Sequence, residues 1–234
     1  MALYAIGDLH LSHQVELKNE AQLTGKIWKD HEKYFEQNCQ KLLTPEDTLV
    51  LVGDHSWGRN LDECREDLEY IMALPGRKIL IRGNHDMFWE AKKTNKLNAL
   101  FAGKLFFLQN NYATYGDVAI VGTKGYCFEG LDSWEHAQML VEREAKRLEE
   151  SFEAARADGY SRFLMFLHYP PTNIFEKSSV FTKMAEHYHA EQVIYAHCHG
   201  EARFHDSIRG RKHGIEYSLV SGDFLRWHPK KIMD

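Results

Sequence analysis

Cysteine is scarce in this sequence, and its spacing excludes a small scaffold held together by disulfide bonds. No two cysteines form a CxxC pair, and a chain of 234 residues is long enough to build a hydrophobic core without cross-links. Reduced thiols are therefore the simpler interpretation of the four cysteines. They are Cys39, Cys64, Cys127 and Cys198.

Long apolar segments are also absent. No apolar run approaches the roughly 20 residues that a helix needs to cross a bilayer. The first ten residues, MALYAIGDLH, contain no basic segment and no long apolar stretch, so they do not look like a cleaved signal peptide. These absences predict a cytoplasmic protein with no membrane partner.

Linkers, repeats and low-complexity tracts are missing as well, which predicts one domain over residues 1–234. The net charge of −5 leaves no excess of positive charge for gripping phosphate backbones. A stable nucleic-acid partner is therefore not expected. Histidine, by contrast, is frequent, and the positions of its 14 copies carry most of the functional argument.

Five short apolar runs recur along the chain, and each is followed by polar residues. They are LYAIGDLH, TLVLVGDH, KILIRGNHD, RFLMFLHYPP and VIYAHCHG. Their length and their β-branched and aliphatic content predict strands covered on both faces. Helices are predicted at 27–43, 61–73 and 135–157, a hairpin at 112–121, and antiparallel strands at 215–220 and 224–227. The alternation predicts an α/β fold with one mixed sheet or two sheets and with helices outside.

Side chains that can bind metals follow these runs at the same end five times. In open α/β sheets, ligands bind beyond the carboxyl ends of the strands. Residues i and i+2 of an extended backbone face one side, so Asp8 with His10, and His197 with His199, can share a site. One such histidine would be an ordinary hydrogen-bonded residue, whereas the recurrence indicates a metal site. The candidates are Asp8, His10, Asp54, Asn84, His85, Asp86, His168, His197 and His199.

The types of ligand indicate the class of metal. Imidazole and carboxylate without thiolate suit Mn, Fe, Co, Ni or Zn better than Mg or Ca. Cys198 stands between His197 and His199, so side-chain alternation points its thiol into the protein. We therefore expect divalent Mn, Fe, Zn, Co or Ni, and no thiolate ligand.

The ordered motifs resemble those of the calcineurin-like metallophosphoesterases. A DxH pair, a GD pair, a GNHD tetrapeptide, a lone histidine after a strand and an HxH pair extend from residue 7 to 199. The resemblance implies a four-layer α/β/β/α sandwich of mixed sheets with two divalent metal ions. For one ion it implies the ligands Asp8, His10, Asp54 and His199. For the other it implies Asn84, His168 and His197, with Asp54 bridging the pair.

The resemblance also implies how the reaction proceeds. Two metal ions roughly 3.5–4 Å apart clamp a phosphate and make hydroxide available near neutral pH. Hydroxide would attack phosphorus in line, while His85 steadies the charge or protonates the leaving oxygen. Asp86 would orient the His85 ring. The expected function is a metal-dependent phosphohydrolase, a phosphodiesterase or phosphatase, acting on a small phosphate ester such as a nucleotide.

Two departures from the family pattern bear on this expectation. Ala196 stands where the family commonly has glycine before its HxH pair, which is too small a change to disturb the ligands. After Asp54 the chain continues HSWGR, whereas the serine/threonine protein phosphatases show GDxxDRG there. The second aspartate is absent and the arginine is displaced by one position. A monoester dianion would thus lack a positive donor, so we expect an aryl phosphodiester to be cleaved at least as efficiently as the monoester.

Aromatic and polar side chains on the predicted loops could contact the rest of the substrate. Any one of them alone would be interpreted as packing beneath a loop. His13 and Arg82 stand close enough to the motifs to touch a substrate. The other loop residues are Trp57, Arg59, Trp89, Tyr126, Phe128, Trp134, Tyr169 and Phe175.

Two alternative functions stay open at this point. A non-catalytic scaffold of the same fold would have lost ligands, whereas all seven ligand positions and His85 are filled. A metal-dependent nuclease is disfavoured by the acidic balance and by the lack of a basic segment. The sequence does not determine the oligomeric state.

Overall fold

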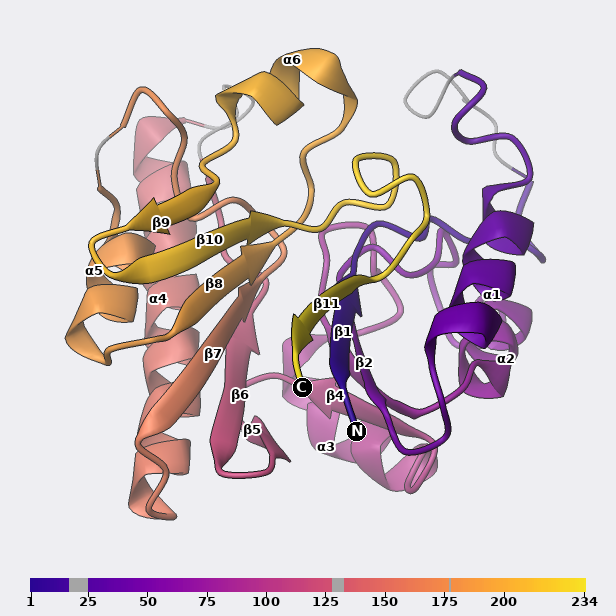
Figure 1. Cartoon of the computed structure of the whole chain (residues 1–234), viewed down its shortest axis with the longest axis horizontal. Helices are drawn as coiled ribbons and strands as arrows, with labels where there is room; N and C mark the ends of the chain where they lie inside the picture. The colour runs from indigo at the N-terminus through magenta and orange to yellow at the C-terminus, as the bar shows by residue number, and fades with distance from the viewer. Residues whose placement is uncertain (17–24, 128–132, 177) are drawn as a thin grey trace.

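The strands form two mixed sheets that face each other. Figure 1 shows them in the computed structural model, which describes residues 1–16, 25–127, 133–176 and 178–234. The first sheet has the order β11-β1-β2-β3-β4, and the second has the order β5-β6-β7-β8-β10-β9. The first comprises β1 (Leu3–Ile6), β2 (Thr48–Val52), β3 (Arg77–Ile81), β4 (Leu105–Leu108) and β11 (Lys230–Met233). The second comprises β5 (Tyr112–Tyr115), β6 (Val118–Thr123), β7 (Arg162–Leu167), β8 (Gln192–Tyr195), β9 (Gly210–Lys212) and β10 (Ile215–Leu219).

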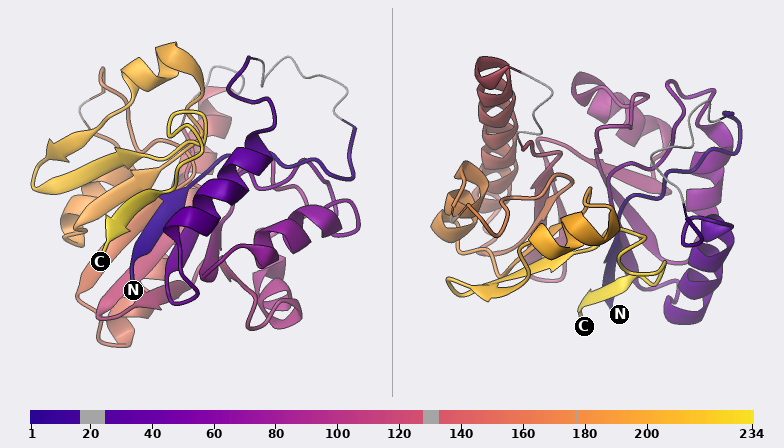
Figure 2. Two further views of the ribbon diagram at one scale, coloured as in Figure 1. Left: turned by 45° about the vertical axis from the view of Figure 1, so that its right-hand side comes forward. Right: turned by 90° about the horizontal axis from the view of Figure 1, so that it is seen from above.

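Helices cover the outer face of each sheet, as the view from above in Figure 2 shows. The first sheet carries α1 (His31–Leu42), α2 (Arg65–Ala73) and α3 (Thr94–Leu100), with the 3₁₀ turn η2 (Ala91–Lys93). The second carries α4 (Trp134–Ala157) and α5 (Val180–His187), and α6 (Gly200–Asp206) lies above its strand ends. No described helix is long and apolar enough to cross a membrane. These layers confirm the predicted α/β/β/α sandwich.

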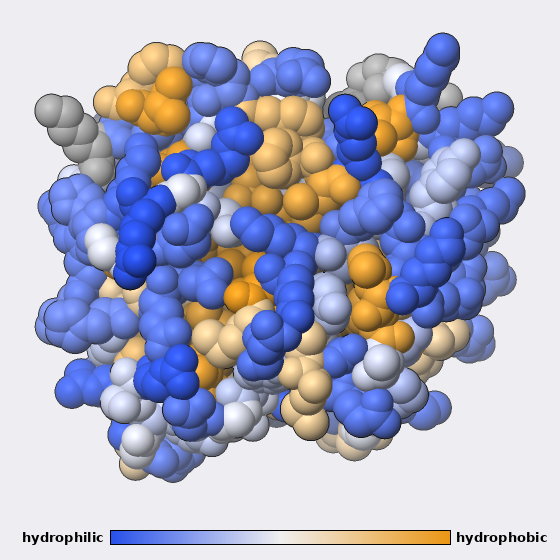
Figure 3. Space-filling view, in the orientation of Figure 1, coloured by the Kyte–Doolittle hydropathy of each residue, from blue (hydrophilic) through white to orange (hydrophobic). Residues whose placement is uncertain are grey.

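Successive residues of the central strands face different layers, which explains why the strands read as continuous apolar runs. In β2, Leu49 and Leu51 pack against the outer helices, whereas Val50 and Val52 face the second sheet. The same alternation holds in β7, where Met165 faces the helices and Leu164 the first sheet. Hydrophilic side chains cover most of the face seen in Figure 3, and hydrophobic ones show through in its middle.

Parallel pairing brings the carboxyl ends of the central strands to one edge of each sheet. In the first sheet β1, β2 and β3 run parallel, and in the second β6, β7 and β8 do so. The two edges are joined at Gly7, whose N–H donates to Val220 O at 2.8 Å. A Cβ at Gly7 would lie 2.6 Å from the Cβ of Ala196 and 2.7 Å from Val52 O. Only glycine therefore permits the sheets to meet here.

Two helices begin later than their apolar spacing predicts. The predicted helix at 27–43 begins at His31, because Asp30 adopts a left-handed backbone conformation with φ of 53°. The predicted helix at 61–73 begins at Arg65, because the Asn60 side chain accepts the N–H groups of Asp62 and Glu63 and holds a turn there. In both cases a local turn replaces the first helical turn.

The prediction of antiparallel strands at 215–220 and 224–227 is half wrong. Residues 215–219 form β10, but its neighbours are β8 and β9, and 224–227 is a series of turns. Arg226 and Trp227 have positive φ values of 50° and 63°, which fold the chain back on itself. The Trp227 ring then covers Gly222, where a Cβ would lie 2.2 Å from the ring. Packing of this tryptophan overrides the strand pattern.

Removing Phe152 should test the packing of α4 on the second sheet. Its ring is fully buried and stacks on Tyr188 with centroids 4.2 Å apart. We expect Phe152→Ala to lower the free energy of unfolding by about 3–5 kcal/mol, since a cavity remains. Met139→Ala on the same helix, at an exposed position, should change it by less than about 0.5 kcal/mol. Urea denaturation measures both, and equal losses would show that this face of α4 does not bear the packing.

Candidate metal centre

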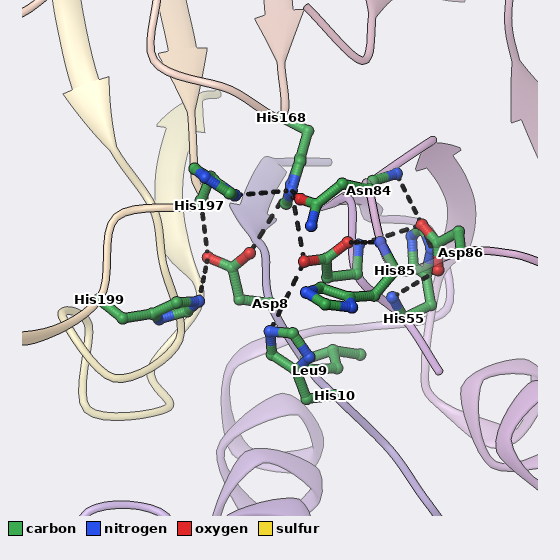
Figure 4. A network of polar contacts seen from close by, with 12 residues as sticks. Asp8, Leu9, His10, His55, Asn84, His85, Asp86, His168, His197 and His199 are labelled. Carbon is green, nitrogen blue, oxygen red and sulfur yellow. Dashed lines mark hydrogen bonds and ion pairs between the residues drawn. The ribbon is translucent and has the colours of Figure 1, made fainter. Parts of the chain in front are cut away.

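Two groups of side chains meet at the edge where the sheets join, and Figure 4 shows them from close by. One group is Asp8, His10 and His199, and the other is Asp54, His168 and His197. Within each group, the atoms that could bind a metal all lie within 4.8 Å of one another. Asn84 adjoins the second group, with its Oδ1 2.7 Å from His168 Nε2. The structure thus brings together all seven residues predicted as ligands.

The Asp54 carboxylate lies between the two groups. Its Oδ2 is 3.4 Å from Nε2 of His168 and 3.7 Å from Nε2 of His10, one histidine from each group. Its Oδ1 accepts the backbone N–H of His85 at 2.8 Å. One carboxylate oxygen therefore faces both candidate metal positions, and the other is held by the backbone.

Hydrogen bonds to the outer ring nitrogens aim two of the imidazoles. His168 Nδ1 lies 3.0 Å from Val52 O, which leaves Nε2 toward the centre. His199 Nδ1 lies 3.1 Å from Oδ1 of Asp223, and its Nε2 points to Asp8 at 3.9 Å. A carbonyl or carboxylate behind a histidine fixes its tautomer and orientation, as is usual for metal ligands.

Four of the predicted ligands have left-handed backbone conformations, which are uncommon for residues other than glycine. The φ values are 61° at Asp8, 45° at His10, 52° at Asp54 and 69° at His197. Backbone hydrogen bonds between the motifs hold them there, including Asp8 N to Gly53 O and His10 N to Asp54 O, both at 2.9 Å. Such conformations cost about 1–3 kcal/mol each and persist where surrounding structure imposes them.

The glycines of the GD and GNHD motifs make room for the ligands. A Cβ at Gly53 would lie 2.3 Å from Nδ1 of His168, and one at Gly83 would lie 2.1 Å from Oδ1 of Asp54. Gly53 also has a φ of 85°, which side chains rarely adopt. These positions must lack a side chain because the ligands themselves occupy that space.

Buried polar atoms at the centre fit divalent cations. In the described part of the chain, Oδ1 of Asp8 and both ring nitrogens of His10 are buried without a hydrogen-bond partner. Buried polar atoms in proteins are nearly always satisfied, so atoms left over in one cluster call for an explanation. Imidazole nitrogens and carboxylate oxygens are together the donors that divalent transition metals prefer.

The pKa shifts of His10 and His168 also indicate that the buried carboxylates need positive charge nearby. Burial lowers the pKa of His10 to about 3, so its ring is neutral and can act as a metal ligand. Burial also opposes protonation of His168, but the carboxylates of Asp54 and Asp8 raise its pKa to about 9. His168 thus neutralises the buried carboxylates by holding a proton. A cation bound between them would take over that role and displace the proton.

The predicted role of Asp86 needs correction. Its carboxylate accepts hydrogen bonds from the backbone N–H groups of Gly83, Asp54 and His55, at 2.7 to 3.0 Å. Its ring partner is His55, whose Nδ1 lies 2.9 Å away, rather than His85. Both side chains are fully buried, so this pair fixes the loops that carry Asp54 and Asn84. Asp86 therefore orients the ligand loops and not the His85 ring.

His85 lies beside the two groups and belongs to neither. Its ring centroid is 4.3 Å from that of Trp57 and 5.5 Å from that of His10. The Trp57 ring also stacks on His10 at 4.9 Å. Trp57 thus supports both histidines from one side.

Three residues of the site were not predicted. Asp223 holds His199, His55 holds Asp86, and the buried Asp67 joins two ligand loops by bonding His13 Nδ1 at 2.6 Å and the Ser56 hydroxyl. The sequence contains a pattern that could have identified Asp223. The segment YSLVSGD has the same apolar run followed by glycine and aspartate as LYAIGD. Asp67 lies on a helix far from the motifs and gave no signal.

The other predicted loop residues separate into distinct groups. Tyr169 contacts His197, with centroids 4.1 Å apart, and Tyr126 contacts Tyr169. Trp89 is part of the core, and the exposed Arg59 pairs with Glu63. Phe128 lies outside the described residues. Tyr126 also lines a cavity of about 590 Å³ near the centre, as do Trp134 and Phe175.

Comparisons with known proteins agree with this geometry. A family model described as calcineurin-like phosphoesterase matches residues 1–201. The matched span contains every residue of the two ligand groups. None of the curated proteins compared with the chain matches it.

Solved structures share the fold at low sequence identity. A phosphopantetheinyl hydrolase from Mycobacterium tuberculosis is 16% identical with a TM-score of 0.57, over 99% of this chain and 95% of that one. A protein of unknown function from Aquifex aeolicus is 20% identical with a TM-score of 0.52, over 98% of this chain and 95% of that one. A protein from Thermus thermophilus is 9% identical with a TM-score of 0.57, over 99% of this chain and 97% of that one.

The contact between Asp223 and His199 predicts a specific loss of metal affinity. We expect Asp223→Asn to weaken binding of one ion by about 10–100-fold, because the ring loses the carboxylate that orients it. Titration of the apoprotein with Mn²⁺ in a calorimeter measures this. Asp206→Asn is the matched control, since Asp206 makes the same kind of contact with the exposed His205 at 3.2 Å. Unchanged affinity in Asp223→Asn would exclude the orienting role.

Proposed function

We propose that this chain, which belongs to the calcineurin-like phosphoesterase family, hydrolyses a small phosphate ester at a centre of two divalent metal ions. Family membership makes it a metal-dependent hydrolase of phosphoric esters. The observation that supports a dinuclear centre is the position of Asp54, with one oxygen facing a histidine of each group. Either group alone, with its three ligand atoms, would account for only one ion.

The proposed ligands divide along the two groups. Asp8, His10 and His199 would hold one ion, and His168, His197 and Asn84 the other, with Asp54 shared between them. When bound, such ions act as Lewis acids toward phosphate and lower the pKa of water, so that hydroxide is available near neutral pH. The imidazole and carboxylate donors favour Mn, Fe, Zn, Co or Ni.

The chain's own residues then bind and position the ester. Trp57 packs against the His85 ring beside the centre, outside the two ligand groups. We assign to His85 the proton that must reach the leaving oxygen, or the stabilisation of the charge that develops there. The Asp86 and His55 pair keeps the loops of Asp54 and Asn84 in place during this step.

Loss of the shared carboxylate tests the dinuclear proposal. We expect Asp54→Ala to abolish activity and to deplete both ions, because one carboxylate serves two positions. Elemental analysis of the purified variant and hydrolysis of a chromogenic ester measure the two effects. Asp62→Ala, at an exposed position paired with Arg65, should leave both unchanged, since surface ion pairs contribute little. Two full equivalents of metal with normal turnover would rule out the shared role.

Replacing His85 should separate metal binding from chemistry. Because His85 belongs to neither ligand group, we expect His85→Gln to retain metal while kcat falls roughly 10²–10⁴-fold, as on loss of a general acid. His199→Ala, by contrast, should lose metal. Metal content and kcat are measured on both variants. If His85→Gln sheds metal as fully as His199→Ala, His85 is a ligand and its assignment is wrong.

A further inference from the structure

Two cationic side chains lie beside the metal centre and take no part in the proposed ligand set. Arg82 directly follows β3 and precedes the GNHD segment, and Lys124 directly follows β6. Both strands end at the edge that carries the ligands, one in each sheet. The two residues are half-buried. They therefore stand at the ligand-bearing ends of strands from opposite sheets.

Among the described residues, neither cation is neutralised by a carboxylate. None lies within ion-pair distance of Arg82 or Lys124 in that part of the chain, and Nε of Arg82 is buried without a hydrogen-bond partner. Two acidic residues act electrostatically on Arg82, and both are already engaged. Asp86 accepts hydrogen bonds from backbone N–H groups and pairs with His55. Glu144 of α4 bonds the Thr123 hydroxyl at 2.6 Å and the Arg147 guanidinium at 2.5 Å. Burying a cation without a partner is costly, so two such cations call for a ligand.

The backbone of Lys124 is fixed beside His168, a proposed ligand. Its carbonyl oxygen accepts the backbone N–H of His168 at 3.2 Å and that of Tyr169 at 2.9 Å. Its amine lies 5.4 Å from the Tyr169 ring centroid and 5.9 Å from that of Tyr126. The Tyr169 ring in turn lies against His197. The amine is thus one aromatic ring away from a proposed ligand.

Arg82 and Lys124 lie close enough to each other for their charges to repel. An anion between the cations would relieve this repulsion.

We propose that Lys124 and Arg82 form an anion subsite at the metal centre, which binds the additional negative charge of a phosphomonoester dianion. The proposal rests on the proposed function, since it names the ester class that the same centre selects. A monoester dianion carries one more charge than a diester, and two cations without carboxylate partners favour the more highly charged group. The chain is therefore a phosphatase in preference to a phosphodiesterase.

This proposal opposes the sequence-based expectation of diester cleavage. That expectation depended on the displacement of the arginine after Asp54 from the position it has in the protein phosphatases. The structure provides cations from two other positions, directly after β3 and directly after β6. A comparison of a phosphomonoester with the matching phosphodiester decides between the two expectations.

The test uses the metal-loaded enzyme with p-nitrophenyl phosphate and bis-p-nitrophenyl phosphate. We expect the wild type to favour the monoester in kcat/KM by about tenfold or more. Lys124→Gln should lower kcat/KM for the monoester about tenfold or more, the effect of one lost hydrogen bond to a charged group, and that for the diester far less. Arg82→Gln should act in the same direction, and Lys124→Arg should restore most of the preference.

Binding of inorganic phosphate gives a second readout that does not depend on turnover. Calorimetry on the metal-loaded protein should show phosphate affinity falling about tenfold in Lys124→Gln and unchanged in Lys146→Gln, an exposed position on α4. Equal losses for both esters, unchanged phosphate affinity, or diester preference in the wild type would each overturn the subsite. If the wild type binds phosphate through Lys124 but cleaves neither ester, the subsite stands and the proposed hydrolase function fails.

Discussion

Two carboxylates, those of Asp8 and Asp54, lie buried where the two sheets meet, and each needs positive charge within reach. Most other features of the site follow from this need. Four imidazoles surround the pair, and carbonyl and carboxylate groups behind the rings of His168 and His199 turn them inward. Gly53 and Gly83 lack a side chain because His168 and the Asp54 carboxylate fill the space that a Cβ would occupy. Divalent cations would neutralise these carboxylates in place of the proton that His168 otherwise holds.

The sequence predicted the layers and the convergence of the candidate ligands because both depend on local patterns. A strand whose sequence is continuously apolar must be buried on both faces. In β2, Leu49 packs toward the outer helices and Val50 toward the second sheet. Polar residues at strand ends must converge when the strands run parallel. The family resemblance then ordered the seven ligands, and the structure brings them together in the same two groups. The pairing of β1 with β11 places early and late segments in one sheet, which supports the single domain proposed for 1–234.

Other parts of the site depend on contacts that no local pattern encodes. Asp86 stands next to His85 in sequence, yet its carboxylate serves His55 and three backbone N–H groups of neighbouring loops. The turns at 224–227 arise because Trp227 packs over Gly222, which strand propensity does not register. Lys124 matters because no carboxylate of the described residues pairs with it, and that is visible only when its surroundings are placed. Predictions from sequence failed where tertiary contacts set the conformation.

Each ligand group draws on both sheets, and this couples metal binding to the cohesion of the sandwich. Asp8 and His10 follow a strand of the first sheet, whereas His199 follows one of the second. In the other group, Asp54 follows a strand of the first sheet and His168 follows a strand of the second. An ion bound by either group would link the two sheets, which also meet through apolar packing and through backbone hydrogen bonds at Gly7. By linkage, the free energy of metal binding adds to the stability of the folded protein. Removing the metal with a chelator should therefore lower the free energy of unfolding as well as abolish activity.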